Sequence, residues 1–361
     1  MITDEPVRGR FAYLEHPGLL GLPGLEQLRR FVRKDIPYGP IWYLTGTDFL
    51  EVAEGASTWR LPVTPWLQSA AGVMTGGVLA LPADAALGGA LYSTFPPATV
   101  LATSELSIHF LRPPRPESRG LVAHARLIQA GKFQGLSEGT IEDDAGRLLA
   151  HAVARNVITR LPEAPSALPD EPIAWPEYEG PHPFQRPAEG EVVPQEVFDR
   201  MDGLEMMRAW ERGDLPPEPL ACLFGIEPLT VGSGKAACTM PASLWFTTPG
   251  GTFYGGAIAL LADHVLNGAV HTTVEPGTSY ATLDLKVNFL RPIVPDGRPL
   301  EGRATVVHRG RSIAVATAEI LTADGKTAAL ANSSSMILAG RPWRPSEPTA
   351  PIDEPSGDPA G

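Results

Sequence analysis

Cysteine is scarce in this chain of 361 residues, which contains only Cys222 and Cys238. Two cysteines cannot form a disulfide scaffold, and they do not make a paired metal-binding motif. No uninterrupted apolar run approaches the ~18 residues of a membrane-spanning helix. The first ten residues carry four charged side chains before any apolar run. We therefore expect no signal peptide, no membrane insertion and a cytoplasmic location.

Basic residues are also few, because Lys and Arg total 29 against 41 Asp and Glu, giving a net charge of −12. A chain this acidic is a poor partner for nucleic acid or an anionic membrane. No cluster of His, Cys and carboxylate residues has metal-ligand spacing, so we expect neither a metal nor a redox cofactor. The length predicts two globular domains, at roughly 150 residues each.

An internal repeat organises the chain. With an offset of 179 residues and no gap, residues 72–113 match residues 251–292 at 20 of 42 positions, where chance would give about 3. Nine prolines lie in the segment between the two copies, which is typical of an extended linker. We predict an N-terminal extension (1–23), a first domain (24–159), a Pro-rich linker (160–202), a second domain (203–338) and a disordered tail (339–361).

Hydrophobic periodicity predicts the same elements in each copy. In the first copy a short amphipathic helix (24–33) precedes one β-like stretch (47–62). A long segment (76–91) that is apolar nearly all round then predicts a buried helix. Alternating strands follow at 103–111, 121–130, 133–142 and 148–159. The pattern predicts an α+β fold, in which an antiparallel sheet wraps around one long helix in each domain.

A motif stands at the start of each long helix: Gly-x-x-x-Gly-Gly, with an aspartate eight residues after the first glycine of the pair. Gly76 and Gly77 lead to Asp84, and Gly255 and Gly256 lead to Asp263. Bare backbone amides at a helix N-terminus favour negative charge and can bind a carbonyl oxygen that becomes an oxyanion. Aspartate inside an apolar helix is rare unless it is paired or functional.

Eight helical residues span ~12 Å, so each aspartate lies too far from its own glycines to share a reacting group. If the two helices pack antiparallel, Asp263 approaches the glycines of the first copy and Asp84 those of the second. Two differences between the copies favour Asp263. Pro82 removes a hydrogen bond inside the first helix and predicts a kink before Asp84. Asn267, one turn after Asp263, could position that carboxylate or an attacking water, whereas its counterpart is a glycine.

These residues resemble the hotdog-fold acyl-CoA thioesterases of the phenylacetate-degradation type. The resemblance rests on the glycine motif, the downstream aspartate and the Phe-Leu-Arg-Pro at 110–113 and 289–292. It implies a tandem double hotdog that hydrolyses acyl-CoA, in which the aspartates activate water or attack the thioester and the glycine amides bind the thioester oxygen. It also implies substrate contacts at four other positions: Thr75 and Tyr254, which replace the family histidine, and Lys132 and Arg311, in turns expected near the CoA phosphates.

Other interpretations remain open on sequence alone. The glycine pairs could serve only helix–sheet packing, and the aspartates could make structural hydrogen bonds. A decayed site would leave a binding protein for acyl-CoA or an acyl carrier. A hydratase or dehydratase is disfavoured, because no Asp-x-Asn-x-x-His pattern follows either helix. The sheet edges leave room for association into homo-oligomers.

Overall fold

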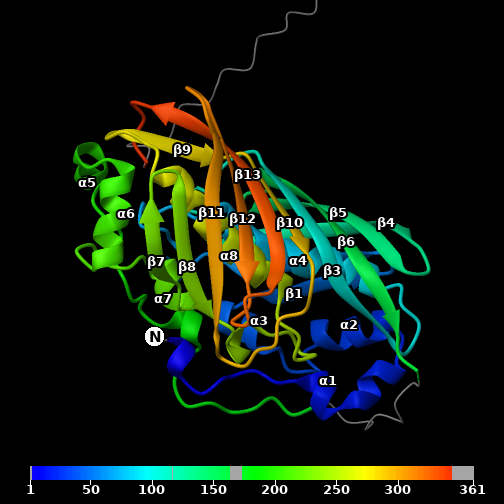
Figure 1. Ribbon diagram of the computed structural model, residues 1–361. Coiled ribbons are helices and arrows are strands. Elements are labelled where there is room, and N and C mark those ends of the chain that lie inside the picture. Colours follow the sequence, from blue (N-terminus) through cyan, green and yellow to red (C-terminus); the bar gives the residue numbers. More distant parts are fainter. Residues whose placement is uncertain (1, 116, 163–172, 344–361) are drawn as a thin grey trace, which may run out of the picture.

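The computed structural model describes residues 2–115, 117–162 and 173–343, so most of the predicted tail lies outside it. Each half of the chain contains one long helix against an antiparallel sheet, α4 (Gly76–Tyr92) in the first and α8 (Gly255–His271) in the second (Figure 1). The α+β fold predicted from the repeat is thereby confirmed. Within the described residues, no helix is both long and apolar enough to cross a membrane.

The strands of the two halves join into one sheet. The first half supplies β1 (Asp48–Ala53), β2 (Ala56–Pro62), β3 (Thr99–Phe110), β4 (Gly120–Ala130), β5 (Gln134–Asp143) and β6 (Leu148–Arg160). The second half supplies β7 (Glu227–Gly232), β8 (Lys235–Pro241), β9 (Thr278–Thr282), β10 (Asp284–Phe289), β11 (Pro299–Arg309), β12 (Ile313–Leu321) and β13 (Thr327–Ala339). Their order is β1-β2-β4-β5-β6-β3-β10-β13-β12-β11-β8-β7, with β9 paired to β13. Every pairing is antiparallel, and β3 meets β10 at the centre.

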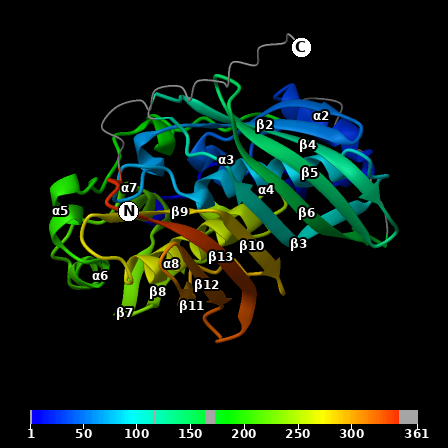
Figure 2. The ribbon, with the colours of Figure 1, turned by 90° about the horizontal axis from the view of Figure 1, so that it is seen from above.

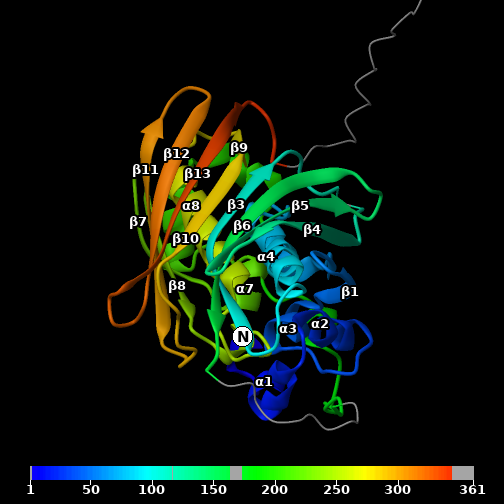
Figure 3. The ribbon, with the colours of Figure 1, turned by 90° about the vertical axis from the view of Figure 1, so that its right-hand side faces the viewer.

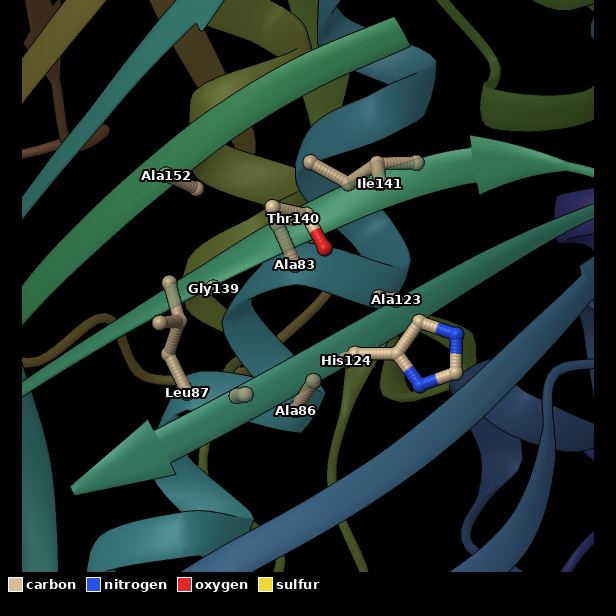
Figure 4. A pocket seen from close by; sticks show the side chains of 10 residues that line it. Ala83, Ala86, Leu87, Ala123, His124, Gly139, Thr140, Ile141 and Ala152 are labelled. Atoms are coloured by element: carbon tan, nitrogen blue, oxygen red, sulfur yellow. The ribbon is translucent and has the colours of Figure 1, made fainter. Parts of the chain in front are cut away.

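The sheet curves around both long helices, which lie side by side inside it (Figures 2 and 3). Small side chains allow this close approach. Ala83 and Ala86 of α4 face Ala123, Gly139 and Ala152 of three strands (Figure 4). Because these side chains are small, the helix axis can come near the sheet without leaving large voids.

Shorter helices close the ends of the sheet. They are η1 (Ile2–Asp4), α1 (Ala12–Glu15), η2 (Pro17–Gly21), α2 (Gly24–Val32), α3 (Pro40–Thr45), η3 (Pro65–Leu67), η4 (Pro183–Gln185), α5 (Gln195–Arg200), α6 (Gly203–Arg212), α7 (Pro219–Phe224) and η5 (Leu244–Phe246). Helices α3 and α7 are exchanged between the halves. The Ile41 amide donates to the Thr247 carbonyl (3.2 Å), and the equivalent Leu220 amide donates to the Gln68 carbonyl (3.1 Å).

The structure corrects two expectations from the sequence and bears on a third. The single β-like stretch at 47–62 is a hairpin, β1 and β2, which turns at Gly55 with φ of +76°. Helix α4 runs from Gly76 to Tyr92 with Pro82 inside it, because packing on all sides holds the helix despite the missing donor; the kink expected at Pro82 stays a prediction. The described part of the linker contains α5 and η4 and is packed on the domains; for example, the Trp66 indole donates to the Arg186 carbonyl.

Candidate active site

Helices α4 and α8 run antiparallel, and each aspartate lies at the N-terminus of the other half's helix. The Gly77 amide donates to Oδ2 of Asp263 at 2.8 Å, and the Gly256 amide donates to Oδ2 of Asp84 at 2.9 Å. Glycine is needed at this contact. A Cβ at Gly77 would lie 2.9 Å from the Cα of Leu260, so any side chain there would push the helices apart.

Two composite sites result, which we name after their aspartates. The Asp263 site contains Thr75, Gly76, Gly77, Asp263 and Asn267. The Asp84 site contains Tyr254, Gly255, Gly256, Asp84 and Gly88. The same sequence motif thus forms two sites related by the pseudo-symmetry of the repeat, and their surroundings differ.

Burial governs the electrostatics of both sites. The Asp84 side chain is buried, and this burial raises its pKa to about 6 against opposing hydrogen bonds from Thr103 and the Gly256 amide. Burial likewise raises the pKa of Asp263, which is 0% exposed. The Gly77 amide, Thr75, His264 and Asn267 oppose that rise. A carboxyl group with a raised pKa is a better proton acceptor than an ordinary aspartate.

At the Asp84 site both carboxylate oxygens are hydrogen-bonded. Thr103 donates to Oδ1 at 2.8 Å and itself accepts from the Asn156 amide at 3.0 Å. The Tyr254 ring covers Gly256, and its hydroxyl donates to the Leu81 carbonyl. Tyr254 is 5% exposed, so the side chain at the position of the family histidine belongs to the core. Both oxygens of the Asp84 carboxylate are therefore hydrogen-bonded beneath a buried tyrosine ring, whereas the Gly255 amide has no acceptor among the described residues.

At the Asp263 site one carboxylate oxygen is left over. Thr282, which corresponds to Thr103, donates to Oδ1 of Asn267 at 2.9 Å instead of to the aspartate. Oδ1 of Asp263 is buried and makes no hydrogen bond among the described residues, although Thr75 and Asn267 lie near enough to lower the pKa of the carboxyl group. Thr75 and Asn267 are only half-buried, unlike Tyr254 and Gly88 at the other site. This site combines an unpaired carboxylate oxygen with two half-buried polar neighbours.

The two glycine amides of the Asp263 site are used differently. Gly77 is bonded to the aspartate, whereas the Gly76 amide donates to no acceptor among the described residues. Gly76 is half-buried, and the Phe110 ring lies against it. A free amide at a helix N-terminus, one residue from the aspartate's anchor, can bind the oxygen of a carbonyl group.

The structure does not bring the remaining predicted residues to either aspartate. Lys132 lies in the turn between β4 and β5, with Nζ 5.1 Å from the centre of the Phe133 ring. Arg311 is exposed in the turn between β11 and β12. Neighbouring Arg309 bonds Thr273 at the C-terminal end of α8, ten residues or ~15 Å along the helix axis from Asp263.

Sequence reasoning missed Thr103, Thr282 and Asn156. The two threonines are identical under the 179-residue offset, so the repeat itself contained a signal for them. No pattern in the chain marked Asn156, because its importance depends on β6 lying beside β3.

Comparison with known proteins places the chain in a family. The family described as the thioesterase superfamily matches residues 71–150 and 250–329, one segment in each half. The chain is 32% identical over 113 residues to a protein of Saccharolobus solfataricus named for a proposed esterase activity. This match covers 31% of the chain and 79% of that relative. A similarly named protein of Haemophilus influenzae is 30% identical, with 32% of this chain and 82% of the relative covered.

A solved structure shows the same fold. It is a protein of unknown function with a hot dog fold from Alicyclobacillus acidocaldarius, and it is 15% identical to this chain with a TM-score of 0.51. The likeness covers 81% of this chain and 96% of that chain. The predicted family is thus confirmed: the chain belongs to the thioesterase superfamily and contains two hotdog domains in tandem.

Proposed function

We propose that the protein hydrolyses acyl-CoA thioesters at the Asp263 site. The observation that supports this most strongly is the pairing of an unpartnered buried carboxylate oxygen with the unoccupied Gly76 amide. The first can accept a proton, and the second can stabilise a developing negative charge. Membership of the thioesterase superfamily supports the reaction class.

In the proposed reaction, the thioester carbonyl oxygen accepts a hydrogen bond from the Gly76 amide. Oδ1 of Asp263 takes a proton from a water molecule as that water attacks the carbonyl carbon. The tetrahedral intermediate then expels the CoA sulfur, which receives the proton from Asp263. The products are a carboxylic acid and free CoA, and Asp263 returns to its ionised form.

Direct attack by Asp263 on the thioester is the alternative route, which forms a mixed anhydride and expels CoA. Isotope labelling detects this route where water then attacks the Asp263 carbonyl of the anhydride, and trapping with hydroxylamine detects it where water attacks the acyl carbonyl. We expect a single turnover in ¹⁸O-water to place the label in the product acid, since water attacks the substrate itself. Label appearing in Asp263, with an unlabelled first product, would identify the covalent route.

Three other groups complete the proposal. Asn267 holds the attacking water beside Asp263, and Thr75 contacts the acyl group at the open side of the site. Arg311 is proposed to contact a phosphate of CoA, because it is exposed in a turn whose neighbour Arg309 bonds Thr273, just past the C-terminal end of the helix that carries Asp263. Lys132 is the corresponding residue for the Asp84 site, whose carboxylate is already fully hydrogen-bonded, so we expect Lys132 to have little effect on turnover.

The test is thiol release from a panel of short, long and aromatic acyl-CoA substrates by the full-length protein. We expect turnover of at least one substrate. If every substrate binds and none is hydrolysed, the protein is a binding module for acyl-CoA or an acyl carrier, and the proposed hydrolase function is wrong.

A further inference from the structure

One half-buried ionisable residue near the Asp263 site has no part in the reaction described above. Glu218 is the residue before α7, and its side chain is 14% exposed. Its Oε2 accepts a hydrogen bond from the Ala70 amide at 2.6 Å, and its Oε1 lies 3.3 Å from Nδ1 of His264. The two partners come from different halves of the chain.

Each partner of Glu218 is close in sequence to one component of the Asp263 site. Ala70 belongs to a tight loop in which the Ser69 amide bonds the Val73 carbonyl and the Gly72 amide bonds the Ser69 carbonyl. That loop leads directly into Thr75 and Gly76. His264 follows Asp263 on α8. Glu218 therefore connects the loop that precedes the free Gly76 amide to the helix that carries Asp263. We call these two contacts, with the Ala70 amide and with His264, the Glu218 tie.

The Asp84 site lacks this arrangement at all three positions. With the same 179-residue offset, Gly39 replaces Glu218, Ala85 replaces His264, and Pro249 replaces Ala70. Proline has no amide hydrogen to donate, and Gly39 packs directly against Pro249. The neighbouring backbone bonds are nevertheless kept in both halves, since Val193 donates to the Ala70 carbonyl and Tyr13 donates to the Pro249 carbonyl. The two halves thus differ in the contacts of Glu218 and keep the neighbouring backbone hydrogen bonds.

We propose that Glu218 is a positioning residue of the Asp263 site, where its two carboxylate oxygens fix the spacing between the Gly76 amide and the Asp263 carboxylate. This inference rests on the proposed function, but its structural part can be measured separately. An error of about 1 Å in such spacing can reduce a rate by about 10²-fold. The charge of Glu218 also reaches the catalytic carboxylate through His264. Glu218 and Asp263 raise the pKa of His264 against its burial, and His264 in turn lowers the pKa of Asp263.

The test compares Glu218→Ala with Glu218→Gln and Ala70→Pro. The glutamine side chain keeps an oxygen for the Ala70 amide, whereas the other two variants each remove that hydrogen bond. Ala70→Pro copies the residue that the other half already accommodates. Two readouts are used: hydrogen exchange of the peptide spanning 69–77, and kcat and KM on the best acyl-CoA substrate. The equivalent peptide, 248–256, is the internal control.

We expect Glu218→Ala and Ala70→Pro to speed exchange in 69–77 at least tenfold and to lower kcat about 30- to 100-fold with KM within about threefold. Exchange in 248–256 should not change, and Glu218→Gln should retain most of kcat while moving the acid limb of the pH profile upward. Unchanged exchange in 69–77, or unchanged kcat, in both Glu218→Ala and Ala70→Pro would overturn the positioning role of Glu218. If the wild-type protein hydrolyses no substrate but exchange in 69–77 is still faster in these variants, the proposed hydrolysis is wrong and the structural role of Glu218 stands.

Discussion

One pair of residues, Asn267 and its counterpart Gly88, decides how the two aspartates are hydrogen-bonded. Asn267 in α8 accepts the hydroxyl hydrogen of Thr282, whereas Gly88 in α4 leaves the equivalent Thr103 free to bond Asp84. One aspartate thus becomes fully hydrogen-bonded and the other retains a free oxygen. The repeat supplies two copies of the motif, and its divergence accounts for the proposed division into one catalytic and one structural carboxylate.

The pKa of Asp84 predicts how stability changes with pH. Because the folded pKa of about 6 exceeds the ordinary aspartate value of 3.8, the folded protein binds more protons than the unfolded chain between these values. Stability contributed by this group is therefore lost as pH rises from about 4 to 6, by about 2–3 kcal/mol. The side chain introduced by Asp84→Asn cannot ionise, so we expect the free energy of unfolding of this variant, measured by urea unfolding, to rise by this amount relative to that of the wild type when the pH is changed from 4 to 8. An identical pH dependence of the two proteins would contradict a raised pKa for Asp84.

The pKa of Asp263 predicts the pH dependence of turnover. Burial raises this pKa, and the ionised form is the one that accepts a proton from water. We therefore expect kcat/KM to rise with pH through a midpoint above the usual aspartate value of about 3.9. A pH–rate profile with His264→Asn as comparison checks this, since loss of the imidazole should shift the midpoint upward. A flat acid limb down to pH 4 would argue against Asp263 as the base.

At the scale of elements, the contact between α4 and α8 positions both sites. We expect Gly77→Ala to destabilise the fold by about 1–3 kcal/mol, because the new Cβ would meet the backbone of Leu260. Gly88→Ala in the same helix is the matched control. Its Cβ would meet only Leu101, at 3.8 Å, and alanine favours a helix by about 1 kcal/mol over glycine. Thermal unfolding measures both, and equal destabilisation by the two variants would contradict the role of the close helix contact.

Much of this arrangement was predictable from the sequence, for definite reasons. The two long helices follow from apolar segments too long for strands, and the antiparallel contact follows from the distance between each aspartate and its own glycines. Helices α3 and α7 escaped prediction because they are short and owe their stability to contacts with the other half. The tie through Glu218 escaped because Ala70, Glu218 and His264 are brought together only by the folded chain.

At the scale of the whole molecule, the halves share one sheet and one helix pair. Strand β3 pairs with β10 across the centre, and α3 and α7 bond to the opposite halves. We therefore expect calorimetry to show a single unfolding transition, which Gly77→Ala shifts as a unit. Two separate transitions, only one of them sensitive to the substitution, would show that the halves are energetically independent.

The most direct test of the account compares Asp263→Asn with Asp84→Asn in steady-state kinetics on the same acyl-CoA substrate. Both substitutions keep the side-chain shape, and each removes the charge from one composite site. We predict that Asp263→Asn lowers kcat by about 10²–10⁴-fold, whereas Asp84→Asn changes it by less than about threefold. Retention of wild-type kcat by Asp263→Asn would contradict the central claim that this carboxylate, facing the glycine amides of the other half, performs the hydrolysis.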